Sequence, residues 1–167
     1  MTRSWHDRAV EEANLFNPAF CATLLAVAAK DFRGKAHRPL PFALGFLVLP
    51  IVLHPDTRAV LPHSTITSLL SWVQGNQACL VGFGQRVSQL KTMTREAILF
   101  GLAHDAIDLG DDGEIAPARG FLAPTERRTE FFTADARDCV DRAAFIGRWF
   151  SAAGTTSTIF SAWGVAP

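Results

Sequence analysis

The longest apolar run in the first third of the chain predicts a buried central helix. From Ala19 to Ala29 only Thr23 is polar, so this helix is apolar on nearly every side. Asn17 and Pro18 before it are a typical N-cap and first-turn pair, and Gly34 is a candidate C-terminal stop. A helix without a polar face must be covered all round, so we expect it at the centre of the domain.

A second apolar run, Phe42 to Leu53, predicts another buried helix that ends near His54. A membrane span needs about 20 apolar residues. This run is shorter and contains Pro50, so it favours a helix of the core and no membrane partner.

Polar positions break the middle of the chain into shorter segments. We expect a helical turn over 55–61 and then a helix over 66–74, capped by Ser64 or Thr65. A further helix over 77–90 is weakened by two glycines.

The stretch before residue 117 combines a helix with a β-hairpin. Thr94 is a candidate cap for a helix over 95–106, and alternating residues then flank an Asp-Asp-Gly turn between Ile107 and Ala116. Helix, helix and hairpin in this order are typical of a winged helix, which we assign to about 64–117.

The C-terminal part, about 135–167, predicts a helical hairpin. Its first helix covers 135–152 and is followed by Gly154, and Gly164 ends a short last helix. The side of the first helix that we expect to face solvent begins with charged residues and becomes aromatic toward its end, at Phe145 and Trp149.

The tail carries large apolar side chains and no charge, which raises the question of what covers it. It either completes the core of the chain or forms one apolar surface with the aromatic row. We expect Phe160 to pack inward and Trp163 to lie at an interface. The candidate partner-interface residues are Phe145, Trp149, Phe160, Trp163 and Val165.

Composition supports a mainly α-helical single domain, 1–167, with one small β-hairpin. Apolar residues make up 49% of the chain and charged residues 19%, which is typical of a well-packed globule. The net charge is zero, but seven basic residues and one acid lie in 33–95, against eleven acids and four arginines in 96–141. We expect one basic and one acidic face.

A zero net charge argues against indiscriminate nucleic-acid binding. The helix before the hairpin also has too few cations to read a major groove. Arg86, Lys91 and Arg95 are possible phosphate contacts. The winged element therefore favours a protein partner, with a winged-helix DNA-binding regulator as the alternative.

The residue types that catalysis needs do not gather into a motif. The three cysteines are isolated and the five histidines do not pair at helical spacing, so we expect no metal and no cofactor. His104 near Glu96 is a possible acid–base pair, but no nucleophile motif accompanies it. We expect no catalytic residue, although a small hydrolase stays open. Isolated free thiols and a first segment without a secretory signal favour the cytoplasm.

Three segments, 11–25, 94–115 and 142–167, together resemble the middle component of bacterial ABC three-component systems. The resemblance covers nearly the whole chain in the same order. It implies a non-enzymatic adaptor between an SMC/Rad50-like ABC ATPase and an effector, acting in defence against phage or plasmid DNA. It also implies that DNA is contacted only indirectly, through the complex.

Overall fold

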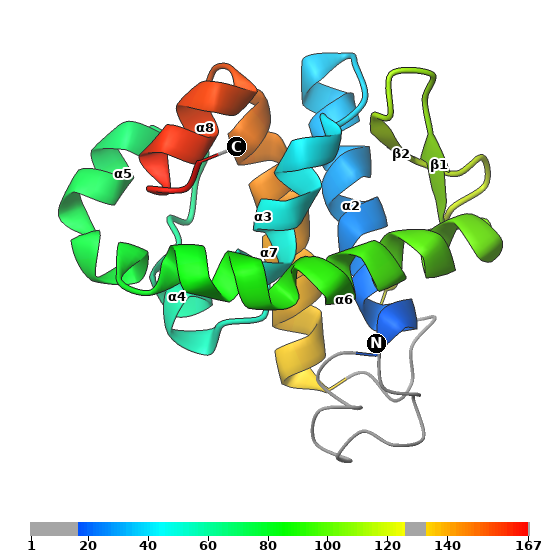
Figure 1. The fold of residues 1–167 in the computed structure, drawn as a ribbon, viewed down its shortest axis with the longest axis horizontal. Helices are drawn as coiled ribbons and strands as arrows, with labels where there is room; N and C mark the ends of the chain where they lie inside the picture. Colours follow the sequence, from blue (N-terminus) through cyan, green and yellow to red (C-terminus); the bar gives the residue numbers. More distant parts are fainter. Residues whose placement is uncertain (1–16, 126–132, 167) are drawn as a thin grey trace.

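Helix α2, Pro18–Ala36, runs through the middle of the molecule, as its unbroken apolar sequence predicts (Figure 1). The structure is a computed structural model that describes residues 17–125 and 133–166. The Asn17 side chain accepts a hydrogen bond from the Ala19 N–H, so the predicted start is confirmed. The predicted stop at Gly34 is wrong, because the helix continues to His37, which itself takes the left-handed conformation (φ 54°).

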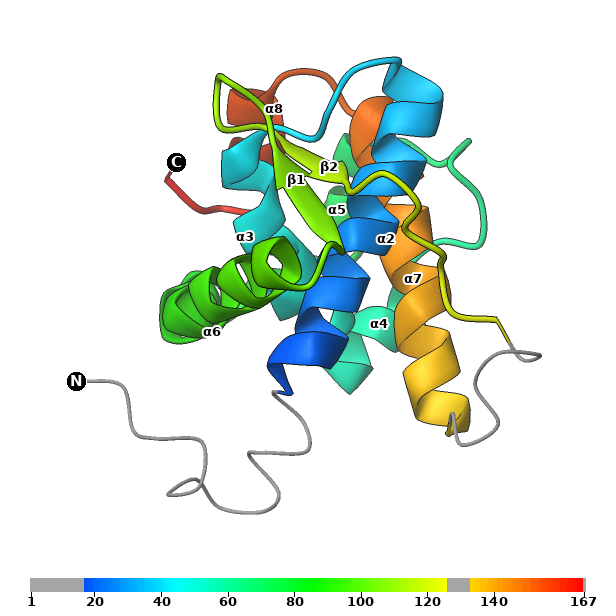
Figure 2. The ribbon, with the colours of Figure 1, turned by 90° about the vertical axis from the view of Figure 1, so that its right-hand side faces the viewer.

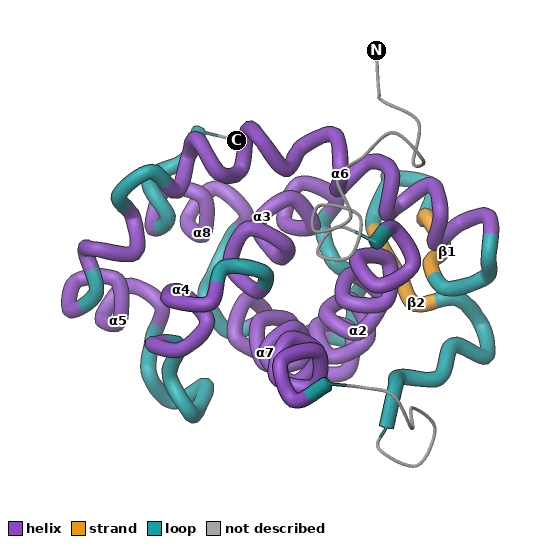
Figure 3. Tube along the Cα trace, turned by 90° about the horizontal axis from the view of Figure 1, so that it is seen from below, coloured by secondary structure: helices purple, strands orange, loops and turns teal. Residues whose placement is uncertain are grey.

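Helix α7, Ala134–Ser151, lies beside α2 in closely packed contact (Figure 3). A Cβ atom added at Gly147 would lie 2.1 Å from the Ala28 carbonyl oxygen. Glycine is therefore required where the two backbones meet. A second C-terminal helix, α8, Thr156–Ala162, follows Gly154, which has a φ of 100°. The assignment of 135–167 as a helical hairpin stays a prediction.

Helices α3, Phe42–Val52, and α4, Pro55–Val60, lie where the apolar run and the following turn predict them. Most of α3 is buried under α2, α6 and α7. Among the residues that the structure describes, no helix combines the length and the apolar character needed to cross a bilayer.

A buried arginine holds α4 against α3 and α7. Arg58 Nε donates to Asp138 Oδ2 at 2.6 Å and Nη1 donates to the Val52 carbonyl oxygen at 2.8 Å, while Nη2 pairs with Asp135. The guanidinium is thus satisfied on several sides, which is the condition for keeping a charge inside a protein.

The middle of the chain differs from the prediction. The helix after α4 is α5, Leu69–Gly75, which Ser68 caps instead of Ser64 or Thr65. A 3-10 turn, η2 (Gln77–Leu80), then leads to one long helix, α6, Phe83–Ala103.

Thr94 lies inside α6, so the predicted cap at this position is wrong. Its Oγ1 donates to the Leu90 carbonyl oxygen at 3.0 Å, and the side chain is fully buried. A threonine hydroxyl can bond back to the preceding turn in this way without ending a helix. One long helix therefore precedes the hairpin, and the winged-helix-like assignment of 64–117 stays a prediction.

The predicted hairpin is confirmed and is firmly docked. Strand β1, Ile107–Leu109, pairs antiparallel with β2, Ile115–Pro117, and Leu40 extends the pairing by bonding Ile115 in both directions (Figure 2). Ile115 packs into the space above Gly45 of α3, where an added Cβ would lie 2.7 Å from it. The architecture is mainly α with one small hairpin, as expected.

Candidate partner-binding groove

The tail tryptophan lies inside the molecule and not at its surface. Trp163 is 1% exposed, stacks on Phe83 of α6 at 4.6 Å, and lies 5.5 Å from the ring of Trp72. The expectation that this side chain faces an interface is corrected by this packing. The covering rings come from α5 and α6, far away in the sequence.

The aromatic row of α7 is also covered by the chain itself. Trp149 meets Trp72 edge to face at 5.4 Å, and its Nε1 donates to the Thr67 carbonyl oxygen at 2.7 Å. Phe145 leans against Trp149 at 5.4 Å and is buried too. The cover of Trp149 thus comes from α5 and the loop before it.

The end of α8 and the residues that follow it are fixed by a Schellman motif. The Val165 N–H bonds the Phe160 carbonyl oxygen at 3.1 Å, and the Gly164 N–H bonds that of Ser161 at 3.0 Å. Gly164 has a φ of 67°, which a glycine adopts without strain. Val165 remains half-buried beside Phe160.

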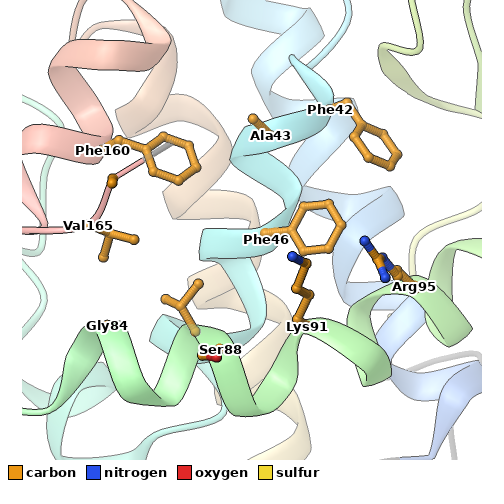
Figure 4. A pocket seen from close by; sticks show the side chains of 11 residues that line it. Phe42, Ala43, Phe46, Gly84, Ser88, Lys91, Arg95, Phe160 and Val165 are labelled. Atoms are coloured by element: carbon orange, nitrogen blue, oxygen red, sulfur yellow. The ribbon is translucent and has the colours of Figure 1, made fainter.

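These two residues border a groove between α3, α6 and α8 with a volume of about 420 Å³ (Figure 4). One wall is the exposed face of α6, and the other is the start of α3. The lining residues are Phe42, Ala43, Phe46, Gly84, Val87, Ser88, Lys91, Arg95, Phe160, Val165 and Ala166.

Two aromatic rings of α3 open into this groove, and sequence analysis did not single them out. Phe42 is 40% exposed and meets Phe46 edge to face at 5.4 Å. The apolar run 42–53 predicts a buried helix, whereas in the structure Phe42 is exposed and Phe46 is half-buried. Their spacing of four residues places them on one helix face, but only the position of α6 and α8 shows that this face is open.

The groove is basic at one end. Lys91 and Arg95 are exposed, and among the described residues neither makes an ion pair. None of the described residues that line the groove is acidic. Figure 4 shows Lys91 beside Phe46 and Arg95 beyond it, away from the end formed by Phe160 and Val165.

Arg86, the third predicted phosphate contact, is engaged elsewhere. Its Nη1 donates to the Pro50 carbonyl oxygen and to Thr57 Oγ1, both at 3.1 Å, and its guanidinium lies 5.5 Å from the Phe83 ring. Burial lowers the pKa of Arg86 from its ordinary value. The structure therefore separates Arg86 from Lys91 and Arg95, which share the groove.

A second hollow of about 400 Å³ lies between α2 and the segment after β2. Lys30, Arg33 and Arg119 line it together with Asp108 of the hairpin. Basic and acidic residues thus meet there, which differs from the expected separation into two faces.

Two of the three thiols, those of Cys21 and Cys139, are buried, and that of Cys79 is half-buried. Cys21, Cys79 and Cys139 are all free. Burial raises the pKa of Cys21 to about 12 and that of Cys139 to about 11, far from the range of a reactive thiolate.

The other candidate chemical groups do not assemble into a site. His104 is exposed and its ring lies 4.1 Å from that of Phe100. In the described part of the chain, no three His, Cys, Asp or Glu side chains are grouped to hold a metal ion.

The family model described as ABC-three component (ABC-3C) system Middle Component 3 matches residues 5–167. No curated protein and no solved structure matches the chain.

Proposed function

The chain belongs to the family of ABC-three component (ABC-3C) system Middle Component 3, and from this membership we propose that it is a non-enzymatic adaptor subunit. It links an SMC/Rad50-like ABC ATPase to an effector in a complex that defends against phage or plasmid DNA. A middle component implies other components, so its main chemistry is protein binding.

The observation that carries this proposal is the open groove. An adaptor must present a surface that its own fold does not need, and apolar side chains on such a surface mark partner contact. Phe42 is such a side chain, because it is exposed although α3 is otherwise mostly buried. Trp163 is buried in the core, so it is not available to a partner. We therefore propose the groove as the docking surface, with Phe160 and Val165 at its edge.

Contact with DNA is assigned to the ATPase and not to this chain. The chain has no net charge, and Arg86 is occupied by bonds within the fold. Two cations in an apolar groove are too few for tight binding of a phosphate backbone. Buried, uncharged thiols suit a reducing compartment, so we place the complex in the cytoplasm.

The test is co-purification of the three co-encoded components with a tag on this chain. We expect wild type to retain the ATPase, the effector or both, and Phe42→Glu to lose at least one of them. Phe42 is the first residue of α3, where an added carboxylate suits the helix N-terminus, so folding is preserved.

Leu99→Glu is the matched control. Leu99 is 65% exposed on α6 and does not line the groove, so this variant should bind as wild type does. Failure of every component to co-purify with wild type would refute the adaptor role. Tight, sequence-specific duplex binding by the isolated chain would instead favour a DNA-binding regulator.

A further inference from the structure

Resting on this adaptor role, we propose that the groove binds one short, acidic, amphipathic helix of a partner component. The partner helix lays apolar side chains against the Phe160 and Val165 end and carboxylates against Lys91 and Arg95.

The dimensions of the groove set the length of its occupant. Gly84, Ser88, Lys91 and Arg95 recur at helical spacing and form one face of α6. At about 1.5 Å per residue this face is roughly 16 Å long, which equals about three turns of a helix. The occupant is therefore a segment and not a domain face.

The backbone of the groove walls indicates that the segment is helical. The walls are α3 and α6, and none of the described residues that line the groove lies in a β-strand. Beyond the first turn of each helix, the backbone N–H groups are bonded within that helix. The groove thus offers no free strand edge to which an extended peptide could add. A partner segment that enters it must satisfy its own backbone groups, and a helix does so.

The two ends of the groove differ, and this determines which end of the partner helix carries its acidic residues. One end is lined by Phe160 and Val165, and the other by Lys91 and Arg95. The exposed ring of Phe42 and the neighbouring Phe46 lie along the α3 wall (Figure 4). Lys91 and Arg95 are one helical turn apart, so they match two carboxylates one turn apart on the partner.

Charge complementarity favours an acidic peptide over other anions. Two cations without an acidic neighbour in the lining attract carboxylates, while the apolar remainder of the groove requires apolar side chains beside them. A nucleic-acid backbone supplies negative charge but no apolar side chains. A helix that carries both carboxylates and apolar side chains is the occupant that uses the whole groove.

The test uses overlapping peptides of about 20 residues that span the co-encoded ATPase and effector, with binding measured by fluorescence anisotropy. We expect the peptides that bind to share apolar residues at helical spacing and acidic residues about one turn further along. Their affinity should fall as salt rises from about 50 to 200 mM.

The deciding variant reverses both cations of the groove, Lys91→Glu with Arg95→Glu. It should weaken peptide binding by about tenfold or more. A peptide whose acidic residues are replaced by lysine should bind this variant and not wild type. Lys30→Glu with Arg33→Glu is the matched control, because it makes the same charge change on exposed helix positions of the second hollow.

The outcomes separate this inference from the adaptor role. If components co-purify with wild type but no acidic peptide binds, or charge reversal leaves binding unchanged, the inference is wrong and the adaptor role stands. Competition for the groove by a DNA duplex or by anionic vesicles that depends on Lys91 and Arg95 would also overturn it. If no component co-purifies, the adaptor role itself fails.

Discussion

The three tryptophans of the aromatic cluster differ in what their indole N–H groups bind. Trp72 donates to the Val60 carbonyl oxygen at 2.9 Å, and Trp149 donates to that of Thr67 at 2.7 Å. Trp163 Nε1 is buried, and within the described part of the chain it has no hydrogen-bond partner. The cluster thus contains two tryptophans that are fixed by polar bonds and one that is held by packing.

This difference predicts that Trp149→Phe destabilises the protein more than Trp163→Phe does. Trp149→Phe leaves the Thr67 carbonyl without its donor, which costs about 1–3 kcal/mol of stability beyond the lost ring area. Trp163→Phe removes an N–H that is already unsatisfied, so it should lower the free energy of unfolding by clearly less. Urea denaturation of both variants measures the difference.

Trp163→Ala gives the loss of stability against which the two phenylalanine variants can be compared. It should destabilise the protein by about 3–5 kcal/mol, because a fully buried ring is lost. An unchanged midpoint for Trp163→Ala would show that Trp163 does not pack on Phe83 and Trp72 in solution.

Cys21 predicts how stability depends on alkaline pH. Burial raises its pKa in the folded protein to about 12, from an ordinary value of 9.0. Between these values the unfolded chain has lost the proton while the folded chain retains it, so the free energy of unfolding falls as pH rises from about 9 to 12. Cys21→Ala should reduce that slope. Equal slopes for wild type and Cys21→Ala across this range would contradict the burial of the thiol.

At the scale of elements, the contact between α2 and α7 depends on one glycine. Gly147→Ala would drive a methyl group into the Ala28 carbonyl oxygen and should cost about 1–3 kcal/mol or more as the helices separate. Gly34→Ala is the control, because Gly34 is helical and has open space around it. That substitution should stabilise α2 by about 0.5–1 kcal/mol. Thermal melts of the two variants should shift in opposite directions, and a neutral Gly147→Ala would refute the close approach.

The sequence predicted those elements whose signals are local. Asn17 and Pro18 mark the start of α2, and the turn around Gly113 marks the hairpin, which has a φ of 74° there. The long helix α6 was missed because Thr94 is a good cap in isolation. In the structure its hydroxyl is satisfied by Leu90 and its methyl group is buried, so packing outweighs the local preference.

The groove could be predicted only in part, because it depends on how distant elements meet. The tail residues Phe160 and Val165 were candidates from their apolar character, and Lys91 and Arg95 from their charge. No pattern along the chain indicates that α3, α6 and α8 bring these pairs together, nor that Trp163 turns inward to Phe83.

At the scale of the whole molecule, the core and the proposed docking groove are distinct but share the tail. Trp163 and Ile159 are buried in the core, whereas Val165 borders the groove. The Schellman motif at Gly164 separates these two roles within a few residues. The short tail therefore closes the fold and also lines the groove.

This sharing predicts that two truncations of the tail behave differently. Removing 155–167 takes Ile159, Phe160 and Trp163 from buried sites, at about 2–5 kcal/mol each. The whole stability margin of such a domain is about 5–15 kcal/mol, so this truncation should prevent folding. Removing only residues 166 and 167 keeps every one of these side chains and the Val165–Phe160 bond, so the circular dichroism spectrum and melting temperature should match wild type. A cooperative, wild-type-like melt of the longer truncation would show that the tail serves a partner and not the fold.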